Sequence, residues 1–217
     1  MTNRPPPREL QRLAIASAKE HVAAAQLLAD NGYANFATFH ILAAVEEIQK
    51  STLVGDQLPE VLEVLKGEPN AREHLRQAAL KHDVKLPLGL LAMLVRSPFL
   101  RVARHPDSEK GISDEEMAKL KEQEATDLEW IVENIVPTAG LDAIREQAIY
   151  SGLDHSGRMP LPFDWKGAVK HLLPLVEVES AFSEYLVEQK LPPEAMEKIR
   201  ARALELIKIV KPDEGRR

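Results

Sequence analysis

Apolar residues recur every three or four positions along most of the chain, which is the spacing of one face of an α-helix. The first such segment spans about residues 8 to 30 and the second about residues 33 to 53, and both are rich in alanine. Asn31 and Gly32 separate them, and both residue types tolerate the left-handed backbone conformation that ends a helix. A connection this short predicts an antiparallel pair of helices.

The expected contact between these two helices is one stripe of apolar and small residues on each. The stripe of the first helix comprises Leu10, Leu13, Ala14, Ser17, His21, Ala24 and Leu28. The stripe of the second comprises Ala34, Ala37, Ile41, Ala44, Val45, Ile48 and Thr52. We predict burial between the helices for six of these residues: Ala24, Leu28, Ala37, Ile41, Ala44 and Ile48.

The same spacing predicts further helices at residues 59–65, 71–85, 88–95, 113–134, 141–149, 165–189 and 192–210. Ser113, followed three residues later by Glu116, has the form of a capping box at a helix start. No segment alternates with period two for long enough to predict a strand. We therefore expect an all-α fold with one domain at residues 8–210, a disordered leader at 1–7 and a flexible tail at 211–217.

The amino-acid composition excludes several classes of function and of location. The 217 residues include no cysteine, which excludes disulfides, thiolate metal sites and a catalytic thiol. The N-terminus lacks the apolar run of a secretory signal, and the longest apolar run, residues 86–95, is too short to cross a bilayer, so we expect a cytoplasmic protein. A formal charge of −6 argues against nonspecific binding to nucleic acid. Two interpretations stay open for the basic residues Arg96, Arg101, Arg104 and His105: a local binding patch or a solvated loop.

Two adjacent glutamates and a lysine interrupt the second helix, in HILAAVEEIQK. Glu46 and Lys50 are four residues apart and share a sector with Phe36 and Phe39, so we expect an ion pair between them at a covered surface. Glu47 lies on a flank with His40. Because buried carboxylates are unfavourable unless they are paired, these residues form either a structural salt-bridge network or a functional site.

A second polar cluster lies in HLRQAALKHDVK, residues 74 to 85, with Arg76, His82, Asp83 and Lys85. If that helix persists, His82 and Lys85 lie on one face. We expect Glu46 or Glu47 and Lys50 to contact His82 or Lys85. The remaining histidines are interpreted without a function: His21 as a core residue, and His155 and His171 as surface or loop residues.

Three stretches taken together, GYANFATFHILAAVEEIQK, KHDVK and IYSGLDHSGRMPLPFD, resemble the abortive-infection AbiV family, a branch of the HEPN group of helical proteins. The matching positions are Glu46, Glu47, Lys50, His82, Lys85, Tyr150, Asp154 and Pro160. The resemblance implies a helical bundle, often dimeric, that defends bacteria against phage by shutting down processes of the infected cell.

Many HEPN relatives are metal-independent ribonucleases with an arginine and a later histidine separated by four to six residues, a spacing that Arg76 and His82 fit with five residues between them. In that interpretation His82 is the acid or base, Arg76 or Lys85 neutralises the phosphate, Glu46 and Glu47 orient these groups, and no cofactor is needed. We expect Tyr150, Asp154 and Arg104 to contribute to binding.

The alternative interpretation is a non-catalytic helical dimer that binds a phage or host protein. We expect a second copy to cover the sector of Phe36, Phe39 and the polar cluster, unless helices within residues 165–210 cover it instead. A di-metal carboxylate site is disfavoured, because none of the histidines follows a glutamate at the Glu-x-x-His spacing.

Overall fold

The computed structural model describes residues 7–55, 86, 89–90, 92–97, 113–135, 141–149, 163–188, 198 and 201, and the fold is all-α as expected. The main elements are α1 (Pro7–Asp30), α2 (Ala34–Gly55), α6 (Asp114–Asn134), α7 (Leu141–Ile149) and α8 (Trp165–Glu188). Residues 86, 89–90 and 92–97 are helical as well. The helices predicted at residues 59–65 and 71–85 lie outside the described residues.

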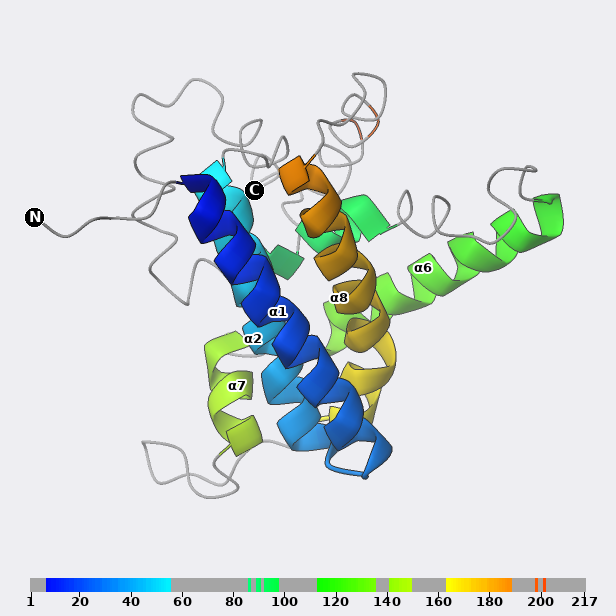
Figure 1. The fold of residues 1–217 in the computed structure, drawn as a ribbon. Helices are drawn as coiled ribbons and strands as arrows, with labels where there is room; N and C mark the ends of the chain where they lie inside the picture. Colours follow the sequence, from blue (N-terminus) through cyan, green and yellow to red (C-terminus); the bar gives the residue numbers. More distant parts are fainter. Residues whose placement is uncertain are drawn as a thin grey trace, which may run out of the picture.

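The α1–α2 turn forms as predicted. Gly32 has a φ of +82°, and the backbone N–H groups of Gly32 and Tyr33 donate to the carbonyls of Ala29 and Leu28. These bonds satisfy carbonyls that the end of α1 would otherwise leave unpaired. The chain therefore reverses direction within three residues, and α2 runs back along α1 (Figure 1).

The buried stripe of α2 matches the prediction, whereas that of α1 does not. Ala37, Ile41, Ala44 and Ile48 are fully buried or nearly so. On α1, however, Ala24 and Leu28 are only half buried and Leu13 is 58% exposed. Ala14 is buried as predicted, but the other buried residues of α1 are Gln11, Ile15, Ala18 and Ala25, which lie outside the predicted stripe.

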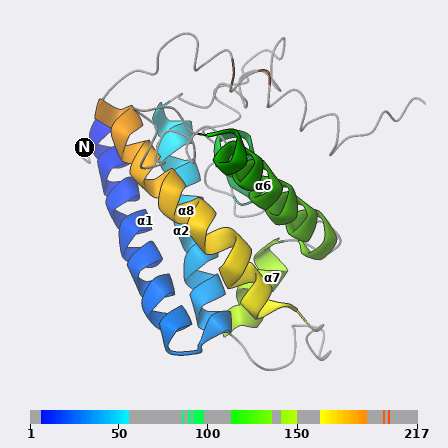
Figure 2. The same ribbon diagram turned by 90° about the vertical axis from the view of Figure 1, so that its right-hand side faces the viewer.

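The stripe of α1 is rotated because α1 packs against two helices. α8 crosses both α1 and α2 on one side of the hairpin (Figure 2). Near the start of α1 and the end of α8, the Arg8 guanidinium donates to the Val187 carbonyl over 3.2 Å. The face of α1 that is buried most deeply therefore points between α2 and α8, about one residue position away from the predicted face.

α7 packs against one edge of the α2 sector for which the sequence predicted a second cover, where Arg145 contacts Glu46. Phe36 remains 42% exposed and the Lys50 side chain 47% exposed. Cover of this sector by a second copy stays a prediction.

α6 joins the bundle through its C-terminal half. Its first turn is held by the predicted capping box, in which the Glu116 N–H donates to Ser113 Oγ and the Ser113 N–H donates to the Glu116 carboxylate. Trp130 and Ile131 belong to the same apolar core as α2 and α8, whereas the first half of α6 extends away from the bundle (Figure 1). No described helix is both long and apolar enough to span a membrane.

We predict that Ile41→Asp leaves the protein unfolded or insoluble. Ile41 is fully buried, and the change removes an aliphatic contribution of about 1.5 to 3 kcal/mol and buries a carboxylate. Leu27→Asp is the matched control, because Leu27 is 65% exposed on the neighbouring helix. Soluble expression and circular dichroism check the pair. Soluble, helical Ile41→Asp protein would contradict the described packing of α2.

Candidate functional site

Glu46, the first glutamate of the α2 motif, points into the bundle. It is buried, and its Oε1 lies 2.8 Å from Nη1 of Arg145 on α7. The side chain of Arg145 is 22% exposed, so its guanidinium lies between the interior and the surface. A second contact between the same helices runs from the Asn35 amide to the Ala148 carbonyl, over 3.1 Å. Together these contacts hold α7 against α2.

Glu47 and Lys50 form a separate pair at the surface. Lys50 Nζ lies 3.3 Å from Glu47 Oε2, and the two side chains are 47% and 22% exposed respectively. The predicted Glu46–Lys50 ion pair is therefore wrong. The reason is that α7 brings Arg145 to the buried carboxylate, while the flexible stem of Lys50 lets its ammonium group remain in water. The adjacent glutamates thus have different environments.

Gln49, one turn before the end of the buried part of α2, is fully buried. Neither amide atom has a hydrogen-bond partner among the residues that the structure describes. Gly89 approaches α2 closely here: a Cβ added to it would lie 2.6 Å from Val45 Cγ1 and 3.3 Å from Gln49 Cβ. Gly89 therefore lies against Val45 and Gln49 of α2 at a distance that only glycine permits.

Arg96 forms the most deeply buried ion pair of the described chain, with Glu179 on α8. Both side chains are almost completely inaccessible to solvent. The interpretation of Arg96 as part of a solvated loop is therefore wrong. Because an unpaired charge cannot be buried without a large loss of stability, the position of Glu179 on α8 is what allows this arginine inside the bundle.

His171 is also buried, which corrects its interpretation as a surface residue. Its Nδ1 lies 2.9 Å from Asp127 Oδ1 on α6, and its ring stacks on Trp130 with centroids 5.3 Å apart. Asp127 accepts a further hydrogen bond from the Gln123 amide, over 2.8 Å. This cluster attaches α6 to α8. The sequence signal was available, since His171 lies in register with Ala168, Leu172 and Leu175, which are all buried.

His21 and His40 face each other across the α1–α2 contact, with their Nδ1 atoms 2.9 Å apart. Both rings are half buried. Burial, together with the charge of His21 when it is protonated, lowers the pKa of His40 below its ordinary value. The lowered pKa means that His40 loses its proton at a lower pH than a free imidazole does.

The structure describes only part of the predicted site, and the catalytic and binding roles of its residues stay predictions. Glu46, Glu47 and Lys50 are described, whereas six expected site residues lie outside the described residues: Arg76, His82, Lys85, Arg104, Tyr150 and Asp154. The contact of the α2 motif with His82 or Lys85 stays a prediction. α7, however, ends at Ile149, directly before Tyr150. Through Arg145, the structure thus joins the α2 motif to the helix that leads into the Tyr150 segment.

Sequence reasoning missed Arg145. A signal was present, because Arg145 lies in IREQAIY, five residues before the tyrosine that the family resemblance singled out. Its nearest helical neighbours on the inner face, Ile144 and Ala148, are buried, which places the arginine at the edge of the core. Among the described residues, no three histidine or acidic side chains are grouped to hold a metal ion.

Comparison with known proteins identifies one family. The HEPN_AbiV family model, described as AbiV, matches residues 7–176. No curated protein and no solved structure matches the chain. The match covers α1, α2, α6 and α7 completely and the first half of α8, and therefore includes Glu46, Arg145 and His171.

We predict that Glu179→Gln lowers the free energy of unfolding by about 3 to 5 kcal/mol, because it removes the charge that faces buried Arg96. The double variant Arg96→Met/Glu179→Met should recover most of this loss, since no charge is then buried. Urea unfolding of the three proteins measures the difference. Lys119→Ala, in an exposed pair with Glu115, is the control and should cost less than about 1 kcal/mol. A similar loss in the double and single variants would contradict the assignment.

We predict that His40 contributes to the pH dependence of stability. Because its folded pKa lies below the unfolded value of 6.5, the unfolded chain binds the proton more readily. The contribution is complete above pH 6.5 and is lost as the pH falls through the folded pKa. His40→Gln should therefore flatten the change in Tm between pH 7.5 and pH 5. An unchanged slope in this variant, measured by circular dichroism, would refute the assignment.

Proposed function

This chain belongs to the AbiV family of HEPN proteins, and we propose that it acts in abortive infection, in the bacterial cytoplasm, as a metal-independent ribonuclease. The family links it to anti-phage defence. The observation that carries the more specific proposal is the contact between Glu46 Oε1 and Arg145 Nη1. This contact joins the EE-K motif of α2, which comprises Glu46, Glu47 and Lys50, to α7. α7 ends directly before Tyr150.

The proposed site lies where α7 meets α2. Arg145 is held by a buried carboxylate yet is partly exposed, so its guanidinium can face a phosphate with little loss of side-chain freedom. Lys50 follows Glu46 by four residues and leaves α2 about 40° from it, one turn further along. Arg145 contacts Glu46, and Lys50 pairs with the neighbouring Glu47, so the two cations are held by adjacent carboxylates of the motif.

The proposed reaction is attack by a ribose 2'-hydroxyl on the adjacent phosphate. His82 removes the hydroxyl proton or donates a proton to the leaving 5'-oxygen, and Arg76 or Lys85 adds positive charge at the phosphate. Lys50 and Arg145 stabilise the negative charge that grows on the phosphate oxygens. Glu46 acts as a positioning residue, since it is buried and holds Arg145. Tyr150, Asp154 and Arg104 are proposed to bind the RNA around this centre.

We predict that Arg145→Ala, Lys50→Ala and His82→Ala each lower the rate of RNA cleavage by about 10² or more, the usual effect of removing one group that stabilises transition-state charge or transfers a proton. Purified protein is incubated with total cellular RNA and with tRNA, and the products are resolved on a gel. Lys119→Ala is the matched control, an exposed lysine on α6 that also faces a glutamate of its own helix. Circular dichroism verifies that each variant is folded.

The same variants are tested in cells challenged with phage. The ribonuclease proposal requires that protection falls in parallel with cleavage. Protection by all three variants at the level of the parent protein would contradict it, as would wild-type protein that protects cells but leaves every RNA intact.

A non-catalytic homodimer that binds a phage or host protein is the second candidate. The observation that favours it is the exposure of large apolar residues at the turn end of the α1–α2 hairpin: Leu27, Tyr33 and Phe36. Exposed apolar side chains gathered in one region are typical of protein contacts. This candidate predicts that Tyr33→Asp abolishes protection in cells, whereas Lys50→Ala has no effect.

A further inference from the structure

His21 on α1 and His40 on α2 point their Nδ1 atoms directly at each other. The two nitrogens are 2.9 Å apart and the ring centroids are 5.2 Å apart. The centroid distance equals the Nδ1–Nδ1 distance plus one ring radius at each end, so both nitrogens lie on the line that joins the centroids. This is the geometry of a straight N–H···N hydrogen bond.

The hydrogen bond fixes where the protons of this histidine pair lie. One Nδ1 carries the hydrogen and the other Nδ1 accepts it. In the neutral pair, the donating ring therefore has a bare Nε2, while the accepting ring carries its own hydrogen on Nε2. A pair that binds one further proton has hydrogens on both Nε2 atoms. The pair is thus a base that takes up one proton while its hydrogen bond is kept.

Both Nε2 atoms are open to solvent. Neither forms a hydrogen bond within the described chain, and neither is a buried atom without a partner. The two rings are partly exposed, in contrast to His171, which is buried. Phe39 meets the His40 ring edge to face, with centroids 5.3 Å apart, and so restricts the orientation of the ring. The basic nitrogen of the pair is therefore both held and accessible.

His40 borders the sector of α2 that lies between α1 and α7. Four residues, none of them buried, project at 100° per residue between the directions of His40 and Glu46: Phe36, Ala43, Glu47 and Lys50. One edge of this sector is the contact of Glu46 with Arg145, and the other is the contact of His40 with His21. The histidine pair therefore adjoins the same exposed sector as the two cations Arg145 and Lys50.

His40 is also level with α7 along the bundle. α7 contacts α2 at Asn35, through the Ala148 carbonyl, and at Glu46, through Arg145. His40 lies between these two positions of α2. At 1.5 Å per residue, the backbone of His40 is about 9 Å from that of Glu46 along the helix axis. A phosphate at Arg145 and the adjacent ribose toward His40 would therefore lie along one sector.

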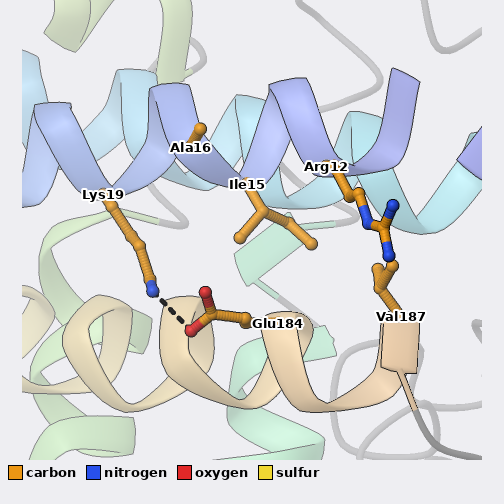
Figure 3. Close-up of a pocket in the computed structure, with 6 residues that line it drawn as sticks. All are labelled: Arg12, Ile15, Ala16, Lys19, Glu184 and Val187. Atoms are coloured by element: carbon orange, nitrogen blue, oxygen red, sulfur yellow. Dashed lines mark hydrogen bonds and ion pairs between the residues drawn. The ribbon is translucent and has the colours of Figure 1, made fainter. Parts of the chain in front are cut away.

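The charged side chains of the neighbouring elements leave the histidine pair to itself. On α1, Glu20 is exposed beside His21, whereas Lys19 projects about 160° away from His21. Lys19 pairs with Glu184 across a pocket of about 290 Å³ between α1 and α8 (Figure 3). The residues of the EE-K motif and Arg145 pair among themselves. In the described chain, each histidine is therefore the hydrogen-bond partner of the other.

We propose that His40 is the general base of the ribonuclease reaction and that His21 is the positioning residue that receives the proton from it. This inference rests on the proposed function, and it leaves to His82 the role of the acid. His40 Nε2 removes the 2'-hydroxyl proton while the bond from the 2'-oxygen to phosphorus forms. The bond from phosphorus to the 5'-oxygen breaks, and His82 protonates that oxygen. The Nδ1 proton of His40 passes to His21 Nδ1, and His21 releases its Nε2 proton to water.

The pKa of His40 agrees with this role. Burial, together with the charge of His21 when it is protonated, lowers this pKa, and a general base must be unprotonated at the working pH. Burial also makes a positive charge on the His40 ring unfavourable. Transfer of the Nδ1 proton to His21 removes that charge as it forms.

His40→Asn separates catalysis from packing. The asparagine amide takes the place of Nδ1 and keeps the contact with His21, but it has no nitrogen at the position of Nε2. Cleavage of total cellular RNA should fall by about 10² or more, with the Tm at pH 7.5 nearly unchanged. His171→Asn is the matched control, since it keeps the contact with Asp127, and it should cleave at the parental rate. Added imidazole should restore part of the cleavage by His40→Ala and none by Lys50→Ala.

The outcomes separate this inference from the proposed function. Parental cleavage by His40→Asn, together with loss of cleavage in Lys50→Ala and Arg145→Ala, would overturn the assignment of His40 and leave the ribonuclease intact. Wild-type protein that leaves every RNA intact would overturn both.

His21→Asn tests the transfer of the proton. A proton on either ring leaves the pair without a bare Nε2, so the rate falls on the acid side as the first proton binds. With one of the two titrating rings removed, the acid limb of the pH–rate profile should move to lower pH. An unchanged profile would reduce His21 to a structural contact and overturn the transfer.

Nitrogen-15 NMR of the imidazole rings examines the pair without any RNA. It should show a hydrogen on Nδ1 of one ring and a bare Nδ1 on the other at neutral pH. Hydrogens on Nε2 alone in both rings would overturn the shared proton, and with it the proposed base.

Discussion

In the part of the bundle that the structure describes, buried charged groups pair with an opposite charge from a second helical segment. Glu46 meets Arg145 from α7, and Arg96 meets Glu179 from α8. Leaving one member of a buried pair alone is far less favourable than leaving both in water. Alanine-rich faces such as those of α1 and α2 can pack at more than one rotation. The Glu46–Arg145 pair restricts how α7 lies against α2, and the Arg96–Glu179 pair restricts how residues 92–97 lie against α8.

This constraint separates the functions of the residues in the EE-K motif. Glu46 is part of the packing, so a change there alters the position of α7 together with any chemistry that depends on Arg145. Glu47 and Lys50 pair with each other at the surface and can change with little effect on the core. The motif therefore connects the interior to the surface, and only its outer members report on chemistry without also reporting on stability.

The inner and outer faces of α1 have a similar composition, although only the inner face is buried. Its inner face contacts α2 and α8 through small residues such as Ala18 and Ala25, and its outer face has alanines at comparable spacing, framed by Leu13 and Leu27. Periodicity alone could not choose between the faces, because apolar residues are found nearly all around the helix. The choice is made by α8, which packs on one side of the hairpin and shifts the burial of α1 toward itself.

The sequence by itself determined the helices and where they begin and end. The tertiary structure decided which side chains pair between helices. Local signals act over a few residues, so the capping box at Ser113, the Asn31-Gly32 turn and the bounds Leu141–Ile149 were predicted correctly. The family resemblance likewise singled out Glu46 from its motif. Which cation Glu46 takes depends on the helix that covers it: Arg145 lies 99 residues away in the chain, whereas Lys50 is only four residues away. Arg96 and His171 were misjudged for the same physical reason, because burial is set by contacts between distant segments that no local pattern records.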